Sequence, residues 1–81
     1  MKIEITNEAV DLILETVDYD LIRYNVENDT KLYEELLSLH MNKVKFLISK
    51  GKFKTQDELI NFLIKYRDSF KSFATPNNLY Y

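Results

Sequence analysis

One spacing of hydrophobic side chains recurs three times along the chain and constrains its fold more than any other feature. Each occurrence places residues at positions i, i+3, i+4, i+7, i+11 and i+14, which share one face of a helix with about 3.6 residues per turn. The three sets are Val10, Ile13, Leu14, Val17, Leu21 and Tyr24; Tyr33, Leu36, Leu37, His40, Val44 and Leu47; and Leu59, Phe62, Leu63, Tyr66, Phe70 and Phe73. Only His40 departs from apolar character. The spacing predicts an all-α domain of three helices around one core.

Residues that cap helix ends stand where the spacing requires them. Thr55 and Glu58 have the spacing of a capping box, in which each side chain accepts the backbone amide of the other residue. Gly51 can adopt the left-handed conformation that closes a helix, and Lys50 complements the negative end of the helix dipole. The earlier helices have short polar side chains at their starts: Thr6 or Asn7, and Asp29 or Thr30. These signals predict a C-terminal helical hairpin of residues 29–50 and 56–73.

The composition fits one small helical domain. One glycine and one proline among 81 residues leave little material for the tight turns of an all-β fold. Hydrophobic residues make up 46% and charged residues 30% of the chain, as in folded globular proteins. We expect a domain at residues 1–73 and a tail at 74–81, which contains Pro76 and paired asparagines. The tail either packs back on the helices or serves as a docking motif.

Residues 21–27 allow a second interpretation. A helix that continued past Asp18 would place Ile22 and Val26 on its acidic face, which suggests a break near Asp20. Residues 21–27 and 2–6 also alternate between apolar and polar side chains, as β-strands do. The alternative fold is therefore a short two-stranded ribbon followed by helices.

The stretch 47–60, with Gly51 at its turn, resembles the inter-helix turn and second-helix start of ribbon-helix-helix repressors and antitoxins. The resemblance implies that residues 21–27 form the strand of a dimeric ribbon. It also implies that Arg23, Asn25 and Glu27 contact DNA bases. A DNA-binding regulator or antitoxin is accordingly the alternative function.

The chemistry-bearing residues do not form a catalytic or metal-binding pattern. The chain has no cysteine and one histidine, and Gly51 stands outside any glycine-rich phosphate loop. No thiolate or local histidine ligand set can form, and the serines lack a glycine-framed nucleophile turn. We therefore expect no enzymatic activity, no cofactor and no metal, and interpret His40 as a hydrogen-bonded residue at the core edge or at an interface. The absence of cysteine and of a long apolar run favours the cytoplasm and no membrane contact.

Charge is distributed unevenly. Residues 1–35 carry ten acidic and three basic side chains, whereas residues 36–55 carry five lysines and no acid. The acids of the first helix lie on one face and form either a solvated surface or a docking site for a basic protein: Glu8, Asp11, Glu15 and Asp18. The lysines gather at the turn of the hairpin and form either a solvated turn or a nucleic-acid contact: Lys45, Lys50, Lys52 and Lys54.

The helices carry more apolar surface than three of them need. Leu32, Leu39 and Phe46 recur every seven residues beside the main apolar face, which widens the apolar arc of that helix to roughly 200°. Ile60 and Ile64 lie off the main face of the third helix and are bordered by Arg67. Packing of the first helix accounts for the former group, whereas a homodimer or a partner groove accounts for both.

Together these features predict a small non-enzymatic interaction protein. Residues with A/T-rich codons dominate the composition, which suggests a phage, a mobile element or a low-GC bacterium as the source. We expect the chain to inhibit or modulate a host macromolecule by binding it, and to form a homodimer.

Overall fold

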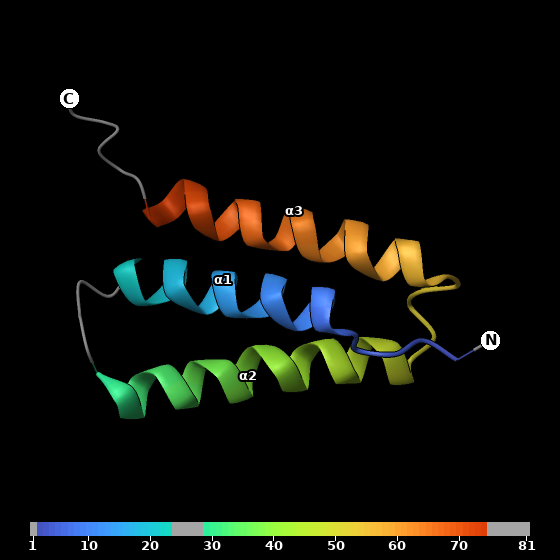
Figure 1. The fold of residues 1–81 in the computed structure, drawn as a ribbon, viewed down its shortest axis with the longest axis horizontal. Coiled ribbons are helices and arrows are strands. Elements are labelled where there is room, and N and C mark those ends of the chain that lie inside the picture. Colours follow the sequence, from blue (N-terminus) through green and yellow to red (C-terminus); the bar gives the residue numbers. More distant parts are fainter. Residues whose placement is uncertain (1, 24–28, 75–81) are drawn as a thin grey trace.

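A computed structural model describes residues 2–23 and 29–74 of the chain. These residues form three α-helices, α1 (Asn7–Arg23), α2 (Thr30–Ser49) and α3 (Gln56–Ala74), and the described part of the chain contains no β-strand. The helices lie side by side, with α1 between α2 and α3 in the view of Figure 1. The prediction of an all-α, three-helix domain is confirmed.

Most residues of the core come from the predicted apolar spacing, whereas Ala9, Leu12 and Phe53 are buried without belonging to it. Ile13 and Val17 of α1, Val44 of α2, and Leu59 and Leu63 of α3 have no solvent exposure. Side chains at the edges of the helices and in the N-terminal segment pack against this core and are half-buried: Ile3, Ile5, Leu37, Met41, Leu47, Ile48, Ile60, Phe62 and Ile64. Burial of a side chain such as leucine stabilises a fold by about 1.5–3 kcal/mol.

Helix α1 does not break at Asp20, and the ribbon alternative is wrong for the described residues. The helix continues to Arg23, which is its last residue rather than a strand residue. Residues 2–6 are irregular, and Ile3 and Ile5 pack on the helical core instead of on a second strand. A helix satisfies its backbone hydrogen bonds within one segment, whereas an isolated two-stranded ribbon is marginal in water. Asn25 and Glu27 lie outside the described residues, as does the tail from residue 75.

The N-terminal segment is held to the start of α3 by one side chain. The amide group of Gln56 accepts a hydrogen bond from the Glu4 backbone N–H at 3.1 Å and donates one to the Glu4 carbonyl at 2.5 Å. The side chain thereby pairs with both backbone groups of one residue, as a neighbouring strand would. This pairing explains how residues 2–6 stay on the bundle without forming a ribbon.

The two helices of the predicted hairpin are consecutive and antiparallel, but α1 intervenes between them (Figure 1). Among the described residues, the closest backbone packing joins α1 to α3 and α1 to α2. Helices α2 and α3 meet through long side chains instead. The three helices therefore form one bundle, and a hairpin that packs on itself gains no specific support.

The predicted N-terminal caps are present. Asp29 Oδ1 accepts the Leu32 amide at 2.9 Å, and Thr6 Oγ1 accepts the Ala9 amide at 3.3 Å. Thr55 Oγ1 accepts the Glu58 amide at 3.2 Å, as expected of a capping box. The return contact differs, because the Glu58 carboxylate accepts the amide of Lys54 at 2.8 Å rather than that of Thr55.

Gly51 ends α2 in the predicted left-handed conformation, with φ of +72°. Its amide donates to the Ile48 carbonyl at 3.0 Å, and the Lys52 amide donates to the Leu47 carbonyl at 3.1 Å. These two bonds are the pair that defines a Schellman motif. A β-carbon at Gly51 would meet no atom within 4 Å, so the need for glycine lies in the backbone conformation alone.

We therefore expect Gly51→Ala to lower the free energy of unfolding by about 1 kcal/mol, because an L-residue with a β-carbon is strained at this positive φ. Gly51→Asn should cost less, since asparagine tolerates the left-handed region better. Urea unfolding followed by circular dichroism measures both. Equal stability of Gly51→Ala and the wild type would contradict the role assigned to this residue.

Candidate functional site

A chain of three polar side chains, two buried and one half-buried, connects all three helices. His40 of α2 lies between Asp20 of α1 and Tyr66 of α3. Its Nε2 is 2.8 Å from Asp20 Oδ2, and its Nδ1 is 2.6 Å from the Tyr66 hydroxyl. His40 is 3% exposed and Asp20 is 2% exposed. The interpretation of His40 as a hydrogen-bonded core residue is confirmed, and its two partners are the part that the sequence did not reveal.

The donors and acceptors of this chain follow from the groups themselves. An ionised carboxylate only accepts hydrogen bonds, so His40 Nε2 carries a hydrogen and donates a hydrogen bond to Asp20. In the neutral ring, Nδ1 then accepts the hydroxyl proton of Tyr66; in the protonated ring, Nδ1 donates to the hydroxyl oxygen. Either protonation state of His40 therefore satisfies both ring nitrogens. A buried polar group that lost such a partner would cost about 1–3 kcal/mol.

Aromatic rings surround the histidine and close the gap between α2 and α3. The ring of Phe70 meets His40 edge-on, with centroids 5.1 Å apart at 86°. Tyr66 stacks on Phe62 at 5.6 Å and 17°, and Phe62 in turn contacts Phe53 at 5.3 Å. This aromatic row excludes water from the imidazole and supplies the contact that the two backbones do not make. The Lys43 ammonium covers the outer side of the row, 5.1 Å from the Tyr66 centroid.

Burial raises the pKa of the Tyr66 hydroxyl above its ordinary 10.0, and the negative charge of Asp20 raises the pKa further. The folded chain thus favours the neutral phenol. Tyr66 consequently contributes stability in full below the pKa of the unfolded state, and this contribution is lost as the pH rises through the folded-state pKa.

Tyr66→Phe is expected to lower the free energy of unfolding by about 1–2 kcal/mol near pH 7, because the ring packing stays and only the hydroxyl bond to His40 is lost. The difference between the wild type and the variant should narrow above pH 10, where ionisation of Tyr66 disfavours the folded wild type. Urea unfolding of both proteins at several pH values measures this difference in the free energy of unfolding. A difference that stays constant up to pH 11 would contradict the raised pKa.

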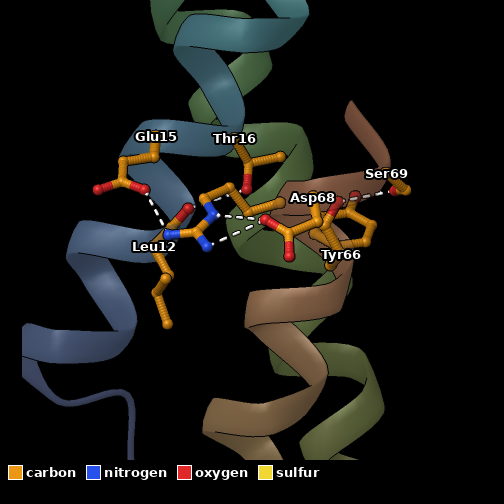
Figure 2. Close-up of polar contacts among 7 residues, drawn as sticks. Leu12, Glu15, Thr16, Tyr66, Asp68 and Ser69 are labelled. Atoms are coloured by element: carbon orange, nitrogen blue, oxygen red, sulfur yellow. Dashed lines mark hydrogen bonds and ion pairs between the residues drawn. The ribbon is translucent and has the colours of Figure 1, made fainter. Parts of the chain in front are cut away.

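The predicted acidic residues of α1, Glu8, Asp11, Glu15 and Asp18, are all exposed. One of them contacts Arg67, the residue predicted to border the Ile60 and Ile64 patch: Glu15 Oε1 is 2.8 Å from Arg67 Nη1 on α3. The guanidinium also meets Asp68 at 3.0 Å, so that it lies between two carboxylates, as Figure 2 shows. The hydrogen bonds that the guanidinium donates to Glu15, first, and to Asp68 raise the pKa of Arg67. Arg67 therefore joins α3 to α1 rather than standing free at the edge of a patch.

The two groups of surplus apolar residues have different surroundings. Ile60 and Ile64 are half-buried and pack against the core, so the bundle itself covers much of their surface. Leu39 and Phe46 remain 60% and 57% exposed on the outer side of α2, and Leu32 is half-buried. The core thus accounts for much of the Ile60 and Ile64 surface, whereas packing of the first helix, one of the two explanations for the other group, does not cover Leu39 and Phe46.

The predicted lysines lie at the end of α2 and in the turn that follows it. Lys45, Lys50, Lys52 and Lys54 are exposed. The Lys50 ammonium is 5.4 Å from the centroid of the Phe46 ring, a cation–π contact that turns it toward its own helix. Glu58 places a carboxylate at the same turn through its bond to the Lys54 amide. The lysines therefore share this turn with a carboxylate, and one of them faces its own helix.

At the opposite end of α2, a shallow hollow lies where α1 ends and α2 begins. Its described lining residues are Asp18, Leu21, Asp29, Thr30 and Tyr33. Partial burial raises the pKa of Tyr33, and the nearby charge of Asp18 raises it further. The carboxylates of Asp18 and Asp29 both border the hollow.

Comparison with protein families, curated proteins and solved structures finds no match to this chain. Among residues 2–23 and 29–74, no group of three or more histidine, cysteine, aspartate or glutamate side chains could hold a metal ion. Over the same residues, none of the helices combines the length and the apolar character needed to cross a bilayer.

Proposed function

We propose that this chain is a small non-enzymatic interaction protein of the cytoplasm, which binds a basic segment of another protein through the exposed face of α1. One observation carries the proposal. Three carboxylates of this face, those of Glu8, Asp11 and Asp18, have no ion-pair partner among the described residues, and Ile22 stands 56% exposed in the same row. We name this set, together with Glu15, the acidic face.

The acidic face combines charge with an apolar contact. By the 100°-per-residue projection of a helix, its five residues fall within about 80° of arc. Like charges at this spacing repel one another and are stabilised when a cationic surface approaches. Ile22 offers the partner an apolar contact at the end of the row, where burial adds affinity that charge alone does not provide.

The interior of the bundle supports a binding role over a chemical one. Asp20, His40 and Tyr66 are the side chains whose chemistry would best suit catalysis. They are hydrogen-bonded to one another between the helices, and aromatic rings cover them. The size of the chain and its A/T-rich-codon composition are in keeping with an inhibitor or modulator encoded by a phage, a mobile element or a low-GC bacterium.

The test reverses two charges that have no structural partner. Asp11→Lys with Asp18→Lys should weaken binding of a partner captured by the wild type at least about tenfold at low salt, because attraction becomes repulsion. Added salt should also weaken binding of the wild type, because it screens the attraction between the acidic face and a basic partner. Calorimetric titration of the purified partner measures the affinity. Glu15 is left unchanged because it pairs with Arg67.

The matched control reverses two exposed acids of other helices, Glu34→Lys with Asp57→Lys, which alter the net charge equally. This control should bind within about threefold of the wild type. Equal losses in both double variants would show that only net charge matters. If only Lys52→Glu with Lys54→Glu lost affinity for the partner, the docking site would lie at the turn after α2 instead.

A further inference from the structure

The outer side of α2 carries an apolar row that the bundle does not cover. Leu39 and Phe46 are 60% and 57% exposed, and Leu32 lies in the same row one heptad earlier. The core side of the same helix is already formed by Leu36, His40 and Val44. Exposed side chains of this size, spaced by seven residues, are typical of a seam where a second helix packs. We call these three residues the α2 row.

The spacing of the α2 row is the same in both directions. Leu32 precedes Leu39 by seven residues, and Phe46 follows it by seven. A twofold axis through Leu39 would therefore place a second, antiparallel α2 so that Leu39 meets Leu39 and Leu32 meets Phe46. Such self-complementarity is what an isologous interface between two copies requires.

The charges of α2 select the antiparallel direction. Residues 29–38 carry three acidic side chains and one lysine, whereas residues 39–50 carry three lysines and no acid. Antiparallel packing lays the acidic half of one helix beside the basic half of the other, and it also opposes the two helix dipoles. Parallel packing would set like charges together over the whole length.

We infer that the occupant of the α2 row is a second copy of this chain, packed antiparallel about Leu39. This inference goes beyond the proposed function and does not depend on it, since the acidic face belongs to α1. The three apolar layers extend over about 21 Å of helix, at 1.5 Å per residue. In this dimer the lysine-rich end of one bundle lies beside the acidic end of its partner.

The first experiment maps the register with single cysteines, which the natural chain lacks. Under mild oxidation, Leu39→Cys should form a disulfide-linked dimer, because the twofold axis brings its two α-carbons within disulfide range. Leu32→Cys and Phe46→Cys should link to each other when mixed and should not link to themselves. Ser38→Cys, exposed on the same helix but off the row, is the control and should stay unlinked.

Efficient linking of Leu32→Cys to itself would indicate parallel packing and would overturn the inference. Linking of Ser38→Cys as readily as Leu39→Cys would overturn it too, because it would indicate random collision. Leu39 and Phe46 are exposed in the single bundle, and Leu32 is half-buried but does not belong to the core, so the substitutions leave the core intact.

The second experiment measures the oligomeric state by analytical ultracentrifugation. The wild type should be dimeric, and Leu39→Arg should raise its dissociation constant by roughly 30-fold or more, as loss of a central interface anchor does. Ser38→Arg should leave the constant within about threefold. A wild type that stays monomeric up to about 1 mM, where an interaction is worth only about 4 kcal/mol, would overturn the inference. Binding through the acidic face could still be intact in that case, so the two proposals fail separately.

Discussion

The architecture depends on how one histidine ring is buried. Both nitrogens of His40 need partners inside the bundle, and these come from Asp20 on α1 and Tyr66 on α3. Apolar contacts alone would permit neighbouring helices to slide, because one leucine packs much like another. Hydrogen bonds of 2.6 and 2.8 Å do not permit it, since a shift by one helical turn of about 5.4 Å would separate the groups. The polar chain thus fixes the axial register of the three helices.

Polar groups have separate tasks inside and outside this bundle. Inside, they pair with one another and fix the helices. Outside, the Arg67–Glu15 ion pair, whose side chains are 25% and 50% exposed, adds little stability in water. It nevertheless pairs one carboxylate of α1 with α3, whereas Glu8, Asp11 and Asp18 form no ion pair with the described residues. The apolar residues divide in the same way, since the core covers Ile60 and Ile64 but not Leu39.

Local signals in the sequence predicted most of the fold. The apolar spacing and the caps at Asp29, Gly51 and Thr55 placed α2 and α3 to within a residue or two, because the groups that end a helix are its near neighbours in the chain. The end of α1 was less certain, since Ile22 disagrees with the helical pattern and stays exposed.

What the sequence could not predict are the contacts across the bundle. Asp20 and His40 are 20 residues apart, and Glu15 and Arg67 are 52 apart. The helical projection places Asp20 beside Ile13 and away from the exposed acids of α1, but it does not indicate which side chain of another helix Asp20 contacts. Which apolar surplus stays open depends on where α1 lies, and the helix spacing alone does not specify that position. His40, the one residue that departs from the apolar spacing, was the available signal that a buried network exists.

The placement of α1 also has a consequence for the order of assembly. The first helix packs more extensively against the last helix than against the second, although the second follows it directly. During synthesis, α1 and α2 therefore emerge before the surface that covers most of α1 exists. Until α3 has been made, the apolar side chains of α1 that pack against it stay exposed to water, and the bundle cannot close.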